Sequence, residues 1–352
     1  MVTSPLTGSV ARSAGWGCES GGWRQPELIN LAKVAGITHR EVETNGIKMH
    51  VAEAGEGPLV VLLHGFPEGW YSWRHQLVTL ADAGFHAVAP DQRGYGRTDA
   101  PQDMAAYGML QLVGDVVGLL AALKEPRAVV VGHDWGAPVA WNTALFRPDL
   151  VRGVVGLSVP YRPRGSRPPL EVYRERLGER FYQVYFQEPG VAEKDLEHDV
   201  RRSMRAFLFA ASGDAPQLAE MMVGTAGWVS GMPEPERLPG WLTEADIDQF
   251  AAEFGRTGFR GGLNWYRNID LNWAQSAPWQ GAKVSVPALY AVGDRDPVYH
   301  FPGGKELAAG LKKFVPNLTR TIVLEGCGHW IQQERPEAVN EALLEFLNGL
   351  EV

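Results

Sequence analysis

Short apolar runs alternate with longer amphipathic stretches along most of the chain. The runs at 58–63, 85–90 and 127–132 are mostly apolar without strict alternation, as in strands that are buried on both faces of a sheet. Between them, residues 69–84 and 105–124 place apolar side chains at helical spacing. This alternation predicts an α/β fold, in which a mostly parallel sheet carries helices on both faces.

The pattern also predicts where the chain changes character. An Asn-Gly pair at 45–46 separates two short alternating runs, which predicts a hairpin before the parallel strands. Beyond Pro160 the rhythm breaks, and it resumes only at 286–293 and 319–326. We therefore predict an extension with little regular structure at 1–36, a split core at 37–160 and 278–352, and a mainly helical insert at 161–277.

Composition narrows the range of partners. The chain has 352 residues and a formal net charge of -8, without the basic cluster that binding of nucleic acid requires. Its apolar runs are too short to span a bilayer, and the N-terminus lacks the pattern of a secretory signal. Cys18 and Cys327 cannot build a disulfide framework and indicate free thiols. We expect a cytoplasmic protein with no nucleic-acid partner and no membrane span, either a monomer or a homodimer.

The stretch VVVGHDWGAPVAW, at 129–141, joins a predicted strand to a predicted helix. Hydrolases with the pattern G-x-S-x-G place a nucleophilic serine at such a turn, and here that position holds Asp134. The N–H groups and the dipole of a helix N-terminus favour a negative charge there. Aspartate is also a preferred helix cap, so this residue alone leaves both roles open.

Three further groups follow predicted strands. His64-Gly65-Phe66-Pro67 could supply a backbone N–H of an oxyanion hole from Phe66, with Trp135 as the second donor, because Pro67 has none. GDRDPV contains Asp294 and Asp296, and CGHW contains His329. Each group alone could be turn chemistry or a surface loop. Their order along the chain, nucleophile then acid then histidine, matches a hydrolase triad.

With these residues in hand, the chain resembles the soluble epoxide hydrolases of the α/β-hydrolase fold from about Thr38 to its end. The stretches that carry the resemblance are HGFPEGWYSWRHQL, DQRGYGRTDAP, VVGHDWGAPVAW, YFQEPGVAEKDLE, GFRGGLNWYRN and GCGHWIQQERPE. The resemblance implies that the insert is a helical cap domain over the active site. It also implies Asp134 as nucleophile, His329 as general base and Asp296 as the acid that orients it, with Asp294 as the fallback.

The same resemblance implies two cap tyrosines that hold the epoxide oxygen. They match Tyr182 and Tyr266, although Tyr185 lies close enough in sequence to compete for the first position. By pattern alone, a cap tyrosine more often serves packing than catalysis.

Carboxylate chemistry suits an epoxide, because an aspartate is already ionised near neutral pH and needs no base before it attacks a saturated carbon. Phenols can donate to the oxygen of the opening ring, and His329 can then activate the water that hydrolyses the ester. The resemblance thus implies an epoxide and water as reactants and a vicinal diol as product, and no metal or organic cofactor is expected. We expect an apolar pocket with Phe66 and Trp135 at its floor, which favours aryl or alkyl epoxides over charged ones.

Two alternatives stay open at this point. A haloalkane or haloacid dehalogenase would use the same aspartate, but haloalkane dehalogenases typically carry asparagine where this chain has Phe66. Fluoroacetate dehalogenases carry arginine where it has Trp135. A non-catalytic small-ligand receptor on the same fold is the alternative from another class.

Overall fold

The computed structural model describes residues 36–216 and 221–350, so the predicted N-terminal extension and Cys18 lie outside the described residues, apart from Gly36. Eight strands form one sheet in the order β1-β2-β4-β3-β5-β6-β7-β8. β2 pairs antiparallel with β1 and β4, and every other neighbouring pair is parallel, which confirms the predicted α/β fold. The strands are β1 (Thr38–Thr44), β2 (Ile47–Ala54), β3 (Leu59–Leu63), β4 (His86–Pro90), β5 (Ala128–His133), β6 (Val151–Leu157), β7 (Ala288–Gly293) and β8 (Leu318–Leu324).

The predicted hairpin is confirmed at β1 and β2. Thr44 pairs with Ile47, so that Asn45 and Gly46 alone make the turn. Both turn residues have positive φ, 44° for Asn45 and 76° for Gly46. A two-residue turn of this kind needs left-handed backbone at both positions, which Asn-Gly adopts at low cost.

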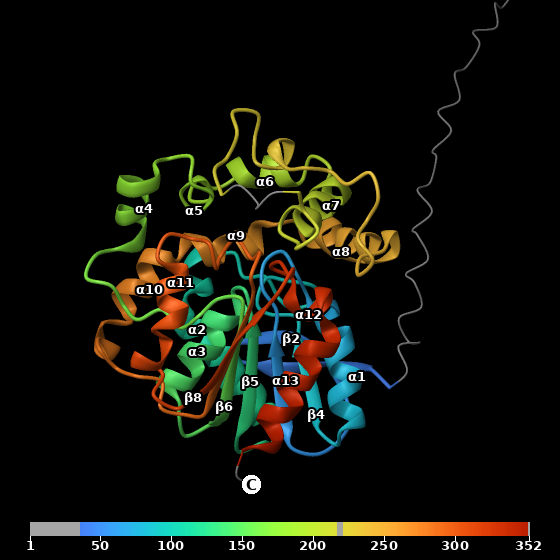
Figure 1. The fold of residues 1–352 in the computed structure, drawn as a ribbon, viewed down its shortest axis with the longest axis vertical. Helices are drawn as coiled ribbons and strands as arrows, with labels where there is room; N and C mark the ends of the chain where they lie inside the picture. The colour runs from blue at the N-terminus through green and yellow to red at the C-terminus, as the bar shows by residue number, and fades with distance from the viewer. Residues whose placement is uncertain (1–35, 217–220, 351–352) are drawn as a thin grey trace, which may run out of the picture. The chain divides into compact units, whose positions relative to one another are not determined.

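Helices cover both faces of the sheet, since every residue of β3 and β5 is buried. α1 packs against α13, and α2 packs against α3 (Figure 1). The predicted helices at 69–84 and 105–124 both form, each preceded by a separate 3-10 turn. The helices and 3-10 turns of the core are η2 (Trp70–Trp73), α1 (Arg74–Asp82), η3 (Met104–Tyr107), α2 (Met109–Leu123), α3 (Gly136–Phe146), α11 (Gly304–Ala309), η6 (Leu311–Lys313), α12 (Ile331–Glu334) and α13 (Pro336–Asn348).

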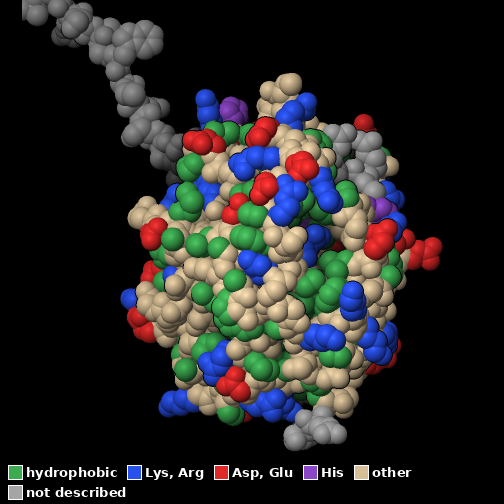
Figure 2. All heavy atoms as spheres, turned by 90° about the vertical axis from the view of Figure 1, so that its left-hand side faces the viewer, with side chains coloured by type: hydrophobic (Ala, Val, Ile, Leu, Met, Phe, Trp, Pro, Cys, Tyr) green, Lys and Arg blue, Asp and Glu red, His purple; other side chains and the backbone are tan. Residues whose placement is uncertain are grey.

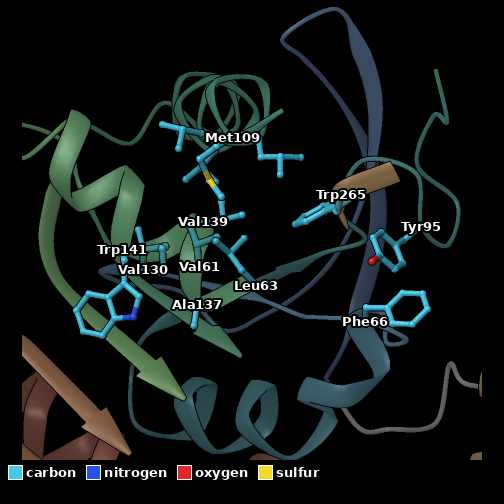
Figure 3. Packing of buried hydrophobic residues seen from close by; sticks show 14 of the residues in the cluster. Val61, Leu63, Phe66, Tyr95, Met109, Val130, Ala137, Val139, Trp141 and Trp265 are labelled. Atoms are coloured by element: carbon cyan, nitrogen blue, oxygen red, sulfur yellow. The ribbon is translucent and has the colours of Figure 1, made fainter. Parts of the chain in front are cut away.

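The packing between sheet and helices explains why the central strands are continuous apolar runs. Val61 of β3 and Val130 of β5 point toward Met109 of α2 and Val139 of α3 in one buried cluster (Figure 3). Neighbouring residues on these strands face the opposite helical layer, so they are buried as well. The sheet thereby holds the strand ends, and whatever follows them, in fixed positions.

Six strands precede the helical segment that separates β6 from β7. Within 161–216 and 221–277 every named element is helical, and α5 to α8 lie together at one end of the sheet (Figure 1). The elements are α4 (Pro169–Leu177), α5 (Tyr182–Tyr185), α6 (Val191–Leu196), α7 (Val200–Ala210), η4 (Val229–Gly231), α8 (Glu244–Thr257), α9 (Arg260–Arg267), α10 (Ile269–Gln275) and η5 (Ala277–Trp279). We refer to this segment as the cap.

The outer surface of the cap is charged. Figure 2 shows acidic and basic side chains intermixed over it, and Arg201 of α7 pairs with Glu244 and Asp248 of α8. Exposed pairs of this kind contribute about 0–1 kcal/mol each, so they indicate a face in water rather than a source of stability. No helix among the described residues is both long and apolar enough to cross a membrane.

Candidate active site

Asp134 occupies a strained turn between β5 and α3. Its φ of 47° lies in the left-handed region, which is unusual for a residue other than glycine. Glycines on either side make the turn possible: a Cβ at Gly132 would lie 2.0 Å from the carbonyl oxygen of Gly136. The helix is capped by Trp135 without a side-chain hydrogen bond, so the alternative role of Asp134 as a helix cap is wrong. Its carboxylate is therefore not committed to the helix terminus.

The loop after β3 contacts this carboxylate through its backbone. The Phe66 N–H donates a 2.8 Å hydrogen bond to Oδ1 of Asp134. Gly65 allows the approach, because a Cβ there would lie 2.3 Å from the Cβ of Asp134. The other predicted donor, the Trp135 N–H, makes no such bond to Asp134 among the described residues. Oδ1 is thus held, while Oδ2 remains available.

His329 lies between the two carboxylates that the sequence places in the triad. Its Nε2 is 3.5 Å from Oδ2 of Asp134, and its Nδ1 is 3.1 Å from Oδ1 of Asp296. Asp296 is fully buried, and its Oδ1 also accepts from the Val298 N–H at 2.8 Å. Asp294 forms no bond with His329 in the described part of the chain, so the geometry favours Asp296 over this fallback.

Ser158 is a neighbour of the histidine that the sequence reasoning missed. Its hydroxyl oxygen lies 3.0 Å from Nδ1 of His329, and its side chain is fully buried. Ser158 directly follows β6 and has a φ of 68°. Its place at a strand end, beside the ends of β5 and β7, was the one signal in the sequence that could have found it.

The electrostatics of the triad follow from burial and charge. Burial opposes the charged form of His329, but the Asp296 and Asp134 carboxylates outweigh it and raise the pKa of His329 well above its usual value. Burial likewise opposes ionisation of Asp296, but His329 outweighs it and lowers the pKa of Asp296. The charge on His329 therefore depends on the charge of Asp134, with consequences for the order of chemical steps.

A second buried pair lies behind the triad and was also missed. Nδ1 of His133 lies 2.6 Å from Oε2 of Glu68, and its Nε2 lies 2.8 Å from the carbonyl oxygen of His329. Both ring nitrogens of His133 therefore face acceptors, and one of these acceptors is the buried carboxylate of Glu68. Glu68 also accepts from the Gly65 N–H at 2.8 Å. The pair thus connects the loop before Phe66 with the backbone of His329.

The two matched tyrosines come from separate cap helices and meet above Asp134. The rings of Tyr182 on α5 and Tyr266 on α9 lie 5.9 Å apart. Burial is the main reason that the pKa of both phenols is raised, so both hold their protons near neutral pH. Tyr185 instead lines a separate pocket beside α6, away from Asp134. The geometry therefore favours Tyr182 over Tyr185.

Two cavities share lining residues around the proposed nucleophile. Asp134, Tyr182 and Tyr266 line both of them. The first cavity includes Phe66 and the second includes Trp135, the two residues expected at the floor of the pocket. Aromatic and apolar side chains predominate in both, which suits an uncharged reacting group. Within the described ranges, no three His, Cys, Asp or Glu side chains gather in a way that could hold a metal ion.

Comparison with known proteins places this chain in a family. The family model for the alpha/beta hydrolase fold matches residues 58–336. Epoxide hydrolase A of Mycobacterium tuberculosis is 47% identical over 90% of this chain and 98% of its own length. Epoxide hydrolase 1 of Siraitia grosvenorii is 49% identical over 88% of this chain and 98% of its own.

Solved structures agree. The crystal structure of epoxide hydrolase A from Mycobacterium thermoresistibile has a TM-score of 0.85 and 48% identity, covering 90% of this chain and 99% of that one. Potato (Solanum tuberosum) epoxide hydrolase I has a TM-score of 0.83 and 41% identity, covering 89% of this chain and 99% of that one. The predicted fold, a core sheet with an inserted helical cap, is confirmed, and the chain belongs to the epoxide hydrolases of the α/β-hydrolase fold.

Proposed function

We propose that this chain hydrolyses epoxides to vicinal diols through an ester on Asp134. One observation carries the proposal: an aspartate stands at the strained strand-to-helix turn, with His329 on one side and two buried phenols lining the same cavities. Neither a serine nucleophile nor a bound cofactor enters the scheme. The relatives named above carry the same activity in their names.

In the first step, Oδ2 of Asp134 attacks an epoxide carbon from the side opposite the ring oxygen. A carbon–oxygen bond forms to Asp134, and the bond from that carbon to the ring oxygen breaks. The leaving alkoxide is a strong base, so it needs a donor, and the protonated phenols of Tyr182 and Tyr266 fit that need. Once the ester exists, the imidazolium of His329 releases a proton that restores the tyrosine, and the proton that His329 later takes from water restores the imidazolium.

In the second step, His329 takes one proton from water as the water oxygen bonds to Cγ of Asp134. The bond from Cγ to the substrate oxygen then breaks, and the diol leaves with the second proton of that water. Ester formation removes the negative charge from Asp134, and that charge is one of the causes that raise the pKa of His329. The pKa of the histidine therefore falls once the ester exists, and His329 can act as a base at the stage that requires one. The Phe66 N–H faces the oxyanion that forms on Asp134, and we assign the same role to the Trp135 N–H. Asp296 holds the imidazole in position.

A dehalogenase would form the same ester, so the test compares leaving groups. Styrene oxide and a haloalkane are incubated with the protein, and diol and halide are measured side by side. Diol from styrene oxide, without halide release, is expected, because phenols suit an oxygen leaving group. Halide release without diol would favour the dehalogenase, and the absence of any covalent adduct on Asp134 would favour a non-catalytic receptor.

The setting of the enzyme is part of the proposal. We propose a cytoplasmic location, which the free, buried thiol of Cys327 supports, since reducing compartments preserve thiols. The reactants are an epoxide and water. Sedimentation velocity distinguishes the monomer from the homodimer.

A further inference from the structure

The second cavity leads from Asp134 to a cation. Arg162 lies in the connector between β6 and α4, has an exposed side chain and lines this cavity. Among the described residues that line either cavity, it is the only lysine or arginine. The second cavity is thus lined mainly by apolar and aromatic side chains, and the one arginine among its described lining residues has an exposed side chain.

The surroundings of Arg162 leave its donors available. Its guanidinium lies over the ring of Phe301, with Cζ 5.9 Å from the ring centroid, and no carboxylate among the described residues lies within ion-pair distance. Arg164, two residues further on, differs. It stacks on Trp273 at 4.0 Å and donates to the carbonyl oxygen of Trp273 and to the side chain of Gln280. Arg164 is therefore tied to the cap, while Arg162 faces the cavity.

A row of aromatic rings joins Arg162 to the reacting centre. The ring of Phe301 lies 5.6 Å from that of Phe181, and Phe181 lies 4.9 Å from Tyr182. Phe301 and Tyr182 both line the second cavity. A substrate substituent in this cavity would therefore run over apolar surface and end at a guanidinium.

We propose that Arg162 determines specificity by binding a carboxylate at the far end of a substrate substituent whose epoxide reacts at Asp134. Arginine recognises carboxylates through paired N–H donors, and a charge at the exposed end of the cavity stays partly hydrated. A carboxylate nearer the centre would be desolvated and repelled by Asp134. This inference rests on the proposed function and names a specificity-determining residue of the same site.

The test uses a terminal epoxide on a straight alkyl chain that ends in a carboxylate, the methyl ester of the same compound, and a series of chain lengths. Diol formation gives kcat and KM for each. For Arg162→Gln we expect kcat/KM to fall about fivefold with the acid, mainly through KM, since an exposed ion pair is worth up to about 1 kcal/mol. For the same variant, kcat/KM with the methyl ester should change less than twofold. Arg162→Lys should recover part of the loss, and added salt should weaken the preference of the unmodified enzyme for the acid.

Arg167→Gln is the matched control. Arg167 lies on the same connector and carries the same charge, but it pairs with Glu171 and Glu175 and does not line either cavity. Arg167→Gln should change kcat/KM to the same extent for the acid and for the methyl ester. Equal losses with acid and ester in Arg162→Gln, or the same acid-specific loss in Arg167→Gln, would overturn the inference while diol formation upheld the proposed function. If the unmodified enzyme formed diol from neither compound, both proposals would fall.

Discussion

Nε2 of His329 lies 3.5 Å from Oδ2 of Asp134, close enough for each charge to control the other. The distance is longer than a good hydrogen bond, as is common in free enzymes before substrate binds. The carboxylate helps to keep the imidazole protonated, and the imidazole faces the oxygen that attacks. The ester proposed on Asp134 ends this arrangement, so the two chemical steps are expected to respond differently to mutation and to pH.

Removal of the base should separate the steps. His329→Gln keeps a side chain that can hydrogen-bond but cannot accept a proton from water. Asp134 should still be alkylated, and the ester should persist, because hydrolysis loses its general base. Mass spectrometry of the intact protein after one equivalent of epoxide should show a stable adduct.

Asp134→Ala is the matched control for that adduct. It lacks the nucleophile, so it should show neither adduct nor turnover. Normal turnover in either variant would refute the role assigned to that residue.

The pH dependence of the two steps should differ in a defined direction. The pKa of His329 is raised in the free enzyme, partly by Asp134, and it should be lower in the ester, where that charge is absent. Hydrolysis needs neutral imidazole, so its rate should increase with pH and level off above the pKa of His329 in the ester.

Single-turnover hydrolysis at a series of pH values gives the midpoint of the rise in rate, which is the pKa of His329 in the ester. NMR titration gives the pKa of the same imidazole in the free enzyme, and the two values are compared. The kinetic midpoint should lie at lower pH. A midpoint at or above the free-enzyme value would contradict the coupling.

Loss of either phenol should slow ring opening. In Tyr182→Phe and Tyr266→Phe, the rate of ester formation should fall about 100-fold, the lower range for one general acid, because one donor to the alkoxide is missing. Stopped-flow quenching of tryptophan fluorescence follows this step.

Tyr185→Phe removes a phenol from the same helix that does not line the cavities at Asp134. Its rate should stay within about twofold of the unmodified enzyme. A loss as large as that of Tyr182→Phe would reassign the donor.

The buried pair behind the triad should govern acid stability. Burial raises the pKa of Glu68, but the His133 ring outweighs it and lowers the pKa to about 2. A lowered carboxyl pKa gives stability that is fully present above the unfolded value, near 4.5, and is lost as pH falls toward 2. Glu68→Gln should remove this dependence and lower the free energy of unfolding at pH 7 by about 3 kcal/mol, since it leaves His133 buried without its partner.

Urea titrations across this pH range measure both effects. Glu345→Gln is the control, because Glu345 pairs with Arg320 at the surface and should cost at most about 1 kcal/mol. Equal effects of the two substitutions would show that burial of the pair does not matter.

The periodicity of the chain predicted the sheet and the hairpin, because burial on one or both faces leaves a repeat in the sequence. The break in that rhythm beyond Pro160 predicted the helical insert. Motifs at strand ends likewise pointed to Asp134, His329 and the pair Asp294 and Asp296, and the resemblance implied Asp296 as the acid. Parallel strands bring their carboxyl ends together, so residues that follow different strands become neighbours.

The remaining features depend on distances that no local pattern encodes. Ser158 is one residue beyond a strand, yet its contact with His329 comes from the fold of the whole sheet. Glu68 and His133 lie within two of the sequence stretches that carry the resemblance, but only the structure shows that they pair. Similarly, the sequence alone could not separate Tyr182 from Tyr185, since both lie on α5. They differ in the cavity that each one lines.

The central claim is that the substrate is bonded to Asp134 before water releases it, and isotope placement tests it directly. The enzyme, in excess over an epoxide, completes one turnover in water labelled with oxygen-18. If water attacks Cγ of Asp134, the label enters this carboxylate, and the first diol contains only unlabelled oxygen. Mass spectrometry measures the oxygen-18 content of the peptide that contains Asp134 and of the diol. Label in the first diol and none in the peptide would contradict the covalent mechanism.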